Sequence, residues 1–266
     1  MSKDHVPRIS VVTVSFNSVG TIAEALDSVA SQTEADVEHI VVDGASTDGT
    51  AEVLESRRSR LSKLVIEPDR GLYDAMNKGL AVATGDIIGY LNSDDVYADS
   101  DVLRKVARAF NDGNIDACYG DLVYVQKDDM SQVVRYWRSR TYSPGLVERG
   151  WMPAHPTFFV RRSILQKLGG FDIRYRYQSD YELMVRLFLK ERISAVYIPE
   201  VLVRMRTGGH TNRSIRNIVK GNLEAYHACR ENGIKVSPLF ILQKMVSRLP
   251  QFFLRPPQQD SSPRGR

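Results

Sequence analysis

Four short apolar runs alternate with helical patterns over residues 1–115, and this alternation constrains the fold more than any other feature. The runs are typical of buried strands, and each is followed by apolar residues at helical spacing. They lie at 9–15, 38–43, 63–67 and 86–92. The alternation predicts an α/β protein with a Rossmann-like, mainly parallel central sheet and helices on both faces. Such a sheet binds its ligand at the carboxyl ends of the strands.

The pattern changes after residue 115. Two strand-like segments, 116–125 and 133–140, flank a polar turn and predict a hairpin added to the sheet. Helical patterns near 162–168 and 180–190 are followed by a strand at 195–206. We therefore expect the second half of the sheet to differ from the first and to form a separate side of the site.

The C-terminal part predicts two amphipathic helices within residues 213–255, and the second of them mixes large apolar residues with Lys244 and Arg248. Basic residues crowd this third of the chain, although the net charge is only +4. Such helices suit peripheral docking on an anionic membrane surface. Packing or dimerisation of the two helices is an equal alternative. Residues 256–266 predict a disordered tail.

Composition excludes several classes of protein. Hydrophobic residues make up 42% and charged residues 26%, the usual balance of a globular α/β protein, and no stretch approaches a membrane span. Cys118 and Cys229 match no metal-ligand spacing, so we expect reduced thiols and a cytoplasmic location. The basic C-terminal helices add an expected contact with the inner face of the membrane. Basic residues do not interleave with stacking aromatics, which argues against a nucleic acid partner.

Polar residues follow the predicted strands. Asp43 ends the second strand, where a carboxylate accepts hydrogen bonds from a nucleobase imide or a ribose hydroxyl. The stretch 41–50 is rich in Asp, Gly, Ser and Thr, which are the residues of turns. A turn followed by a helix cap is therefore an equal alternative. After the third strand, a glycine turn leads into a helix and carries Arg70, Asp74, Asn77 and Lys78, which suit phosphate groups. Asp74 and Lys78 also have the spacing of a helix-stabilising ion pair.

The fourth strand ends in LNSDD, which places Asp94 and Asp95 side by side. Two adjacent carboxylates at the rim of a buried sheet repel each other unless a cation lies beside them. Oxygen ligands favour Mg²⁺ or Mn²⁺, which commonly bridge to substrate phosphates. The sequence therefore predicts a divalent cation here. The alternative is a solvated pair of carboxylates that caps the next helix.

The segments VVTVSFN, VVDGASTDGT, EPDRGLYDAMNKG and GDIIGYLNSDD, in this order and spacing, resemble family 2 glycosyltransferases of the GT-A fold over roughly residues 8–215. The resemblance implies that Asp43 binds the base of a nucleotide sugar and that Asp94 and Asp95 hold the metal and the diphosphate. Asn92 stands where the family usually has Asp. The role that the resemblance still implies for Asn92 is a hydrogen bond to the ribose. Relatives of this pattern build bacterial surface polysaccharides on lipid carriers.

The resemblance continues through MPAHPTFFVRRSILQKLGGFDIRYRYQSDYELMVRL, where it gives Asp180 the role of general base. It also implies that His210 contacts the metal or a phosphate and that Arg206 helps to neutralise the leaving group. His155 is a weaker acceptor-side hypothesis. The residues assigned to the nucleotide sugar are Thr13, Ser15, Asn17, Asp43, Arg70, Asp74, Asn77, Lys78, Asn92, Ser93, Asp94 and Arg206. The metal ligands are Asp94, Asp95 and His210.

We therefore expect a GT-A domain over residues 1–212, with a nucleotide-sugar-binding half (1–115) and an acceptor half (116–212). The implied activity is an inverting, metal-dependent transfer of a single hexose from a nucleotide sugar to a hydroxyl of a lipid-linked glycan. A UDP-sugar is the favoured donor. A homodimer is compatible with this. The alternative is a non-catalytic nucleotide-sugar-binding or scaffold protein. A processive synthase would need membrane spans and a QxxRW motif after the base, and QVVRY lies before it.

Overall fold

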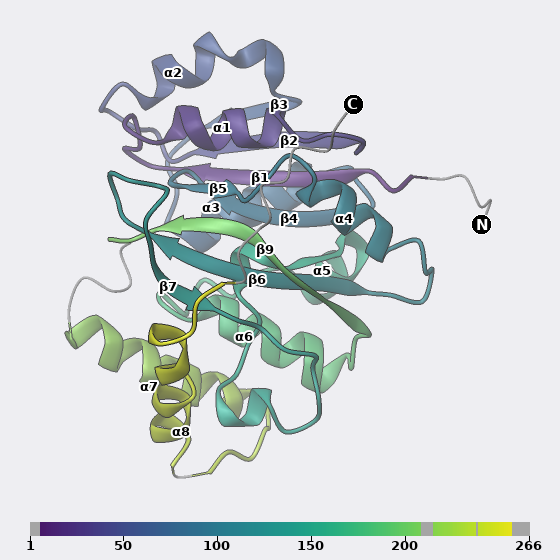
Figure 1. The fold of residues 1–266 in the computed structure, drawn as a ribbon, viewed down its shortest axis with the longest axis vertical. Coiled ribbons are helices and arrows are strands. Elements are labelled where there is room, and N and C mark those ends of the chain that lie inside the picture. The colour runs from purple at the N-terminus through teal and green to yellow at the C-terminus, as the bar shows by residue number, and fades with distance from the viewer. Residues whose placement is uncertain (1–5, 209–214, 238, 257–266) are drawn as a thin grey trace.

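The computed structural model describes residues 6–208, 215–237 and 239–256 (Figure 1). Nine strands of these residues form one sheet in the order β3-β2-β1-β4-β8-β6-β9-β5, with β7 paired to β6. The strands are β1 (Ile9–Ser15), β2 (Val37–Asp43), β3 (Lys63–Ile66), β4 (Ile87–Asn92), β5 (Asp95–Tyr97), β6 (Ala117–Val125), β7 (Val133–Trp137), β8 (Phe159–Arg161) and β9 (Ala195–Arg206). The helices are α1 (Ile22–Ala30), α2 (Thr50–Ser56), α3 (Leu72–Val82), α4 (Val102–Ala109), α5 (Arg162–Leu168), α6 (Ser179–Val185), α7 (Ile215–Glu231) and α8 (Phe240–Val246).

The sheet has a parallel part and a mixed part. The first four strands pair in parallel, as the alternation predicted. Beyond β4 the direction reverses, because β8 lies antiparallel between β4 and β6, and β5 lies antiparallel to β9. The β6–β7 hairpin is confirmed. The short strands β5 and β8 were not predicted, since three residues are too few to show a periodic pattern.

Both faces of the sheet are covered, which confirms the layered α/β fold. Every residue of β1 is buried, and its side chains alternate between two cores. Val12 and Val14 pack on the side of α3, α5 and α6, whereas Ile9 and Val11 pack on the side of α1 and α4. The parallel strands therefore end in one rigid edge, and the loops that leave this edge form the site.

The C-terminal helices pack on the body of the protein, at the opposite end of the molecule from α1 and α2 (Figure 1). Ala225, Ala228 and Cys229 of α7 and Phe240 of α8 are fully buried in the core that contains α6. The predicted second helix is shorter than expected, because α8 ends at Val246 and a 3-10 turn, Leu249–Phe252, follows. Cys118 and Cys229 are free and buried, as expected. Among the described residues, no helix has the length and apolar character to span a membrane.

Candidate active site

Asp43 lies at the carboxyl end of β2, beside the end of β1. The parallel register pairs it with Ser15, whose Oγ donates a hydrogen bond to Asp43 Oδ2 at 2.7 Å. The amide N and Oγ of Ser46 donate two further bonds, at 2.8 and 2.7 Å. The residue is fully buried. Asp43 is thus a carboxylate held by hydroxyl and amide donors, and sequence reasoning missed the part of Ser46 in that arrangement.

The loops after β1 and β2 are tied together by Asn17. Its backbone has a φ of 49°, a left-handed conformation that Asn tolerates better than most residues. Its amide N donates to Ser46 Oγ at 2.8 Å, and its Oδ1 accepts from the Thr47 amide at 2.9 Å. Ser18 Oγ lies 2.8 Å from Ser93 Oγ, which links these loops to the end of β4. The ends of three parallel strands therefore form one polar edge.

Asp95 begins β5 at the same edge and is fully buried. Its Oδ2 accepts a hydrogen bond from Asn92 Nδ2 at 3.1 Å. Within the described residues, Asp95 Oδ1 and Asn92 Oδ1 are buried without a hydrogen-bond partner. Burial and the neighbouring carboxylate of Asp94 raise the pKa of Asp95 well above its ordinary value. Such a carboxyl group gains most from a cation, which would both replace the missing contacts and favour ionisation.

Two observations bear on a complete metal site. Among the described residues, no group of three or more His, Cys, Asp or Glu side chains is arranged to hold a metal ion. His210, the third predicted ligand, lies outside the described residues. The orphaned oxygens of Asp95 and Asn92 nevertheless fit a hard divalent cation, which prefers oxygen ligands.

Arg206 comes from the end of β9, next to the partner of Asp95 in the β5–β9 pairing. Its guanidinium donates to Glu24 of α1, and the side chain is nearly buried. Its Nε has no hydrogen-bond partner within the described residues. The structure therefore brings Arg206 to the Asp95 edge, where its charge favours the ionised form of Asp95.

The residues predicted to contact phosphate are divided in the structure. Some of them bond within or to the turn before α3, whereas Asn77 bonds to another loop. Arg70 donates to Asp74 from its amide and its guanidinium, at 3.0 and 2.9 Å, and these bonds lower the pKa of Asp74. Lys78 instead donates to the carbonyl of Pro68 at 2.6 Å. Asn77 exchanges two hydrogen bonds with the backbone of Phe171, both at 2.8 Å. Asn77 thus fastens α3 to the loop before α6, a structural contact that the sequence did not indicate.

Thr13, which was also assigned to the nucleotide sugar, does not reach the polar edge. It is fully buried in the middle of the sheet, and its Oγ1 lies 3.0 Å from Nε2 of His39 on β2. The remaining roles assigned to the nucleotide sugar stay predictions.

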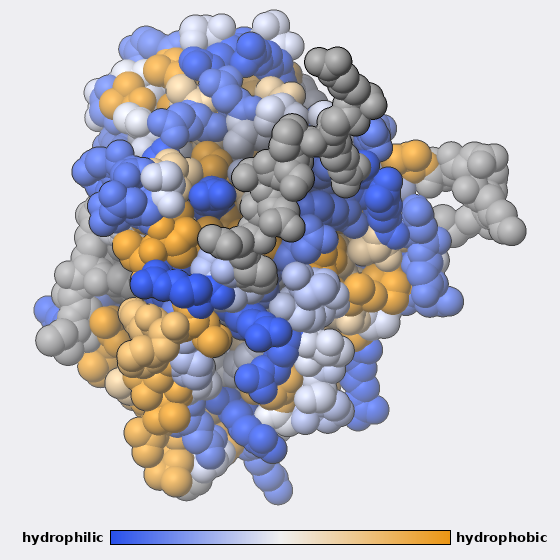
Figure 2. All heavy atoms as spheres, viewed as in Figure 1, coloured by the Kyte–Doolittle hydropathy of each residue, from blue (hydrophilic) through white to orange (hydrophobic). Residues whose placement is uncertain are grey.

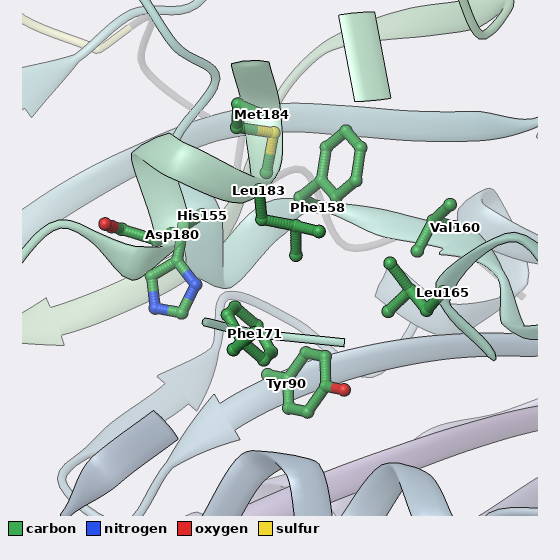
Figure 3. Close-up of a pocket in the computed structure, with 9 residues that line it drawn as sticks. All are labelled: Tyr90, His155, Phe158, Val160, Leu165, Phe171, Asp180, Leu183 and Met184. Carbon is green, nitrogen blue, oxygen red and sulfur yellow. The ribbon is translucent and has the colours of Figure 1, made fainter. Parts of the chain in front are cut away.

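Asp180 is the second residue of α6 and lies across the site from β4. Its Oδ1 accepts hydrogen bonds from Tyr73 Oη at 3.2 Å and from the Tyr181 amide at 2.8 Å. Asp180 and His155 line a small pocket with Tyr90 and Phe171 (Figure 3). Burial lowers the pKa of His155, and the neighbouring carboxylate of Asp180 opposes this shift.

The N-terminus of α6 is held by the C-terminal helices. Glu224 Oε2 of α7 accepts from the amides of Tyr177 and Gln178, at 2.7 and 3.1 Å. Lys244 Nζ of α8 donates to Gln178 Oε1 at 2.5 Å and lies 4.5 Å from the centre of the Tyr181 ring. These contacts were missed, because each joins positions tens of residues apart. The one signal in the sequence was the presence of the charged residues Glu224 and Lys244 in otherwise apolar helical patterns.

Comparison with known proteins supplies the family. The sequence matches the family Glycosyl transferase family 2 over residues 10–169. A "PGL/p-HBAD biosynthesis glycosyltransferase" of Mycobacterium bovis is 29% identical over 79% of this chain and 80% of its own length. The structure resembles TarS of S. aureus in complex with UDP-GlcNAc, with a TM-score of 0.64 and 17% identity over 92% of this chain and 72% of that one.

A second solved structure has the same fold. The mannosyltransferase PcManGT of Pyrobaculum calidifontis, in complex with GDP-Man and Mn²⁺, matches with a TM-score of 0.62 and 22% identity, over 92% of this chain and 70% of its own. These likenesses confirm the GT-A fold, and the family match covers more than half of the chain. The chain belongs to glycosyltransferase family 2.

Proposed function

We propose that this protein is an inverting, metal-dependent hexosyltransferase that transfers one sugar from a nucleotide sugar to a hydroxyl of a lipid-linked glycan in cell-surface polysaccharide synthesis. The observation that carries the proposal is the buried Asp95 carboxyl with its partnerless oxygen, at the strand edge that also presents Asp43. A buried polar atom without a hydrogen-bond partner calls for an explanation, and a cation bound between Asp95 and Asn92 would supply one. A non-catalytic binder would not need Asp180 across the site.

Each side of the site has a distinct task in this mechanism. Asp43 accepts hydrogen bonds from the donor base or ribose, and Arg206 offsets charge on the diphosphate. Asp180 accepts the proton of the acceptor hydroxyl as its oxygen bonds to the anomeric carbon. The bond from that carbon to the diphosphate oxygen breaks on the opposite face, so the configuration inverts and the nucleoside diphosphate leaves. Mg²⁺ or Mn²⁺, when bound by Asp95, Asp94 and Asn92, would stabilise the charge of the leaving diphosphate.

UDP is our preferred donor nucleotide. TarS is described in complex with UDP-GlcNAc, whereas PcManGT is described with GDP-Man and Mn²⁺. The same fold therefore accommodates different bases, and the donor must be tested directly. The relative named for PGL/p-HBAD biosynthesis supports a biosynthetic rather than a degradative role. We also propose that the protein works as a peripheral protein at the inner face of the membrane.

Calorimetric titration with UDP, GDP and dTDP, each with Mn²⁺ and with EDTA, tests the donor site. We expect one nucleotide to bind with Mn²⁺ and to lose roughly 100-fold in affinity with EDTA or with Asp95→Asn, since that variant removes a charged ligand without changing the shape. Asp128→Asn, which changes an exposed carboxylate elsewhere, is the matched control. Equal binding with and without metal would refute metal dependence. No binding of any nucleotide would refute the donor site.

A further inference from the structure

A second hollow lies outside the donor and acceptor residues. It is a groove of about 890 Å³ between the segment 137–152 and the C-terminal part formed by α8 and the 3-10 turn after it. Figure 2 shows apolar residues gathered over α8 and hydrophilic residues beside them. We call this hollow the C-terminal groove. Its volume is that of a site for a small molecule or a segment of a long chain.

One wall of the C-terminal groove is apolar. Leu242 and Val246 of α8 line it and are 57% and 52% exposed, and Trp151 and Met152 line the facing side. Exposed aliphatic side chains on a short helix gain free energy when an apolar chain covers them. The shape of this wall therefore suits an alkyl or isoprenyl chain.

Four arginines also line the C-terminal groove. They are Arg138, Arg140, Arg149 and Arg248. Within the described part of the chain, none of these guanidinium groups forms an ion pair with a carboxylate. Burial raises the pKa of the Asp121 carboxyl group, and the charge of Arg138 opposes this shift. Several arginines that line one hollow favour an anion, and their planar donors match phosphate oxygens.

The positive charge extends beneath the groove. Lys244 is 1% exposed, and burial together with Arg248 lowers its pKa to about 7. Burial and Arg248 also lower the pKa of Arg135, which bonds to Gln251 at the groove. A bound anion would favour the charged forms of these buried groups.

The C-terminal groove adjoins the acceptor side of the active site. Gly150 of the groove packs so closely on Lys244 that a methyl group on Gly150 would lie 2.6 Å from Lys244 Cβ. Lys244 in turn bonds to Gln178, two residues before Asp180. A molecule held in the groove would therefore be attached beside the helix that carries the proposed base.

We propose that the C-terminal groove binds an amphiphile with a phosphate head and an apolar chain, and that this is the lipid carrier of the acceptor glycan. The apolar wall takes the chain, and the arginines take the phosphate. Naming the ligand as the carrier of the acceptor rests on the proposed function, whereas the chemistry of the ligand rests on the groove alone. A bilayer surface is a different occupant, which the experiment distinguishes.

Intrinsic fluorescence tests the proposal, because both tryptophans of the chain, Trp137 and Trp151, line the groove. Purified protein is titrated with dodecyl phosphate below its micelle concentration, and in parallel with inorganic phosphate and with dodecyl maltoside. We expect a saturable change with dodecyl phosphate at least roughly 10-fold tighter than with either reference, because only that probe has both the charged head and the chain.

Two groove variants and one control sharpen the test. Arg149→Ala and Leu242→Asp should each weaken dodecyl phosphate binding by roughly 10-fold, and both positions are exposed, so the fold should persist. Arg108→Ala, at an exposed arginine of α4, should leave binding unchanged. Dodecyl phosphate binding that is unchanged in both groove variants would overturn the proposal. Binding to anionic vesicles without any binding of monomeric dodecyl phosphate would also overturn it.

Nucleotide titration of the same preparations separates this proposal from the proposed function. If UDP, GDP and dTDP all fail to bind while dodecyl phosphate binds in the groove, the groove stands and its assignment to the acceptor of a transferase falls. If a nucleotide binds with Mn²⁺ and dodecyl phosphate does not bind, the groove proposal falls and the donor site stands.

Discussion

The proposed donor side and the proposed acceptor side of this site are built in different ways. Contacts on the donor side join loops at the ends of neighbouring parallel strands, as in Ser15 to Asp43 across 28 positions and Ser18 to Ser93 across 75. On the acceptor side, Tyr73 reaches Asp180 across 107 positions and Lys244 reaches Gln178 across 66. The donor side thus depends on loops that meet at one edge of the sheet, whereas the acceptor side depends on helices from distant parts of the chain that must pack together. Substitutions on the two sides should therefore have separate effects, one set on donor binding and the other on turnover.

The largest expected effect is that of Asp180→Asn. Loss of the proton acceptor should lower kcat by roughly 10²–10⁴-fold, the usual contribution of a general base. Because Asp180 lies on the acceptor side, the dissociation constant of the donor nucleotide should change less than about 2-fold. Turnover is followed by release of the nucleoside diphosphate, and binding by calorimetry. A similar loss in nucleotide affinity would break the separation between the two sides.

Acid should weaken the sheet beneath the donor side through His39. Burial lowers the pKa of His39 from 6.5 to about 4, so the unfolded chain takes up a proton below pH 6.5 that the folded protein does not. Stability is therefore lost as the pH falls from 6.5 towards 4, by about 3 kcal/mol at 1.36 kcal/mol for each pH unit.

Urea unfolding of the wild type and of His39→Gln, measured from pH 7 to pH 4.5, checks this effect of His39. The variant should show a flatter dependence, since Gln keeps a partner for Thr13 and does not titrate. The range ends at pH 4.5 because Glu38, whose pKa is lowered to about 2, begins to contribute below that value. Equal slopes for the two proteins would show that His39 is protonated in the folded state.

Glu224→Ala tests whether α7 positions the base. Removing the carboxylate leaves the amides of Tyr177 and Gln178 without their acceptor, so the start of α6 should loosen and kcat should fall by roughly 10-fold. Glu231→Ala is the matched control, because Glu231 on the same helix bonds instead to the Tyr175 hydroxyl. Nucleotide affinity should be the same for both variants. Equal kcat values for both would exclude a positioning role for Glu224.

The sequence indicated the meeting of the strand-end residues better than the surroundings of Asp180, and the roles assigned to both sets stay predictions. Asp43, Asp94 and Asp95 follow apolar strands directly, so their meeting at one edge follows from the parallel sheet. The sequence could not indicate that Tyr73 bonds to Asp180 or that Lys244 lies beneath the groove, because both contacts depend on tertiary packing. Asn77 shows a contact that its motif did not indicate, since its position suggested a phosphate contact and its amide fastens α3 to Phe171.

The smallest expected effect is that of Tyr73→Phe. Tyr73 joins the two sides, because it is the second residue of α3 and bonds to Asp180. The substitution removes one hydroxyl and keeps the ring stacked on Phe171, so the fold should persist. Loss of one hydrogen bond to a carboxylate should lower kcat by roughly 5-fold. If donor affinity stays constant, Tyr73 belongs to the acceptor side. If kcat and donor affinity fall together, Tyr73 couples the two sides, and the separation between the strand-end loops and the packed helices does not extend to the first turn of α3.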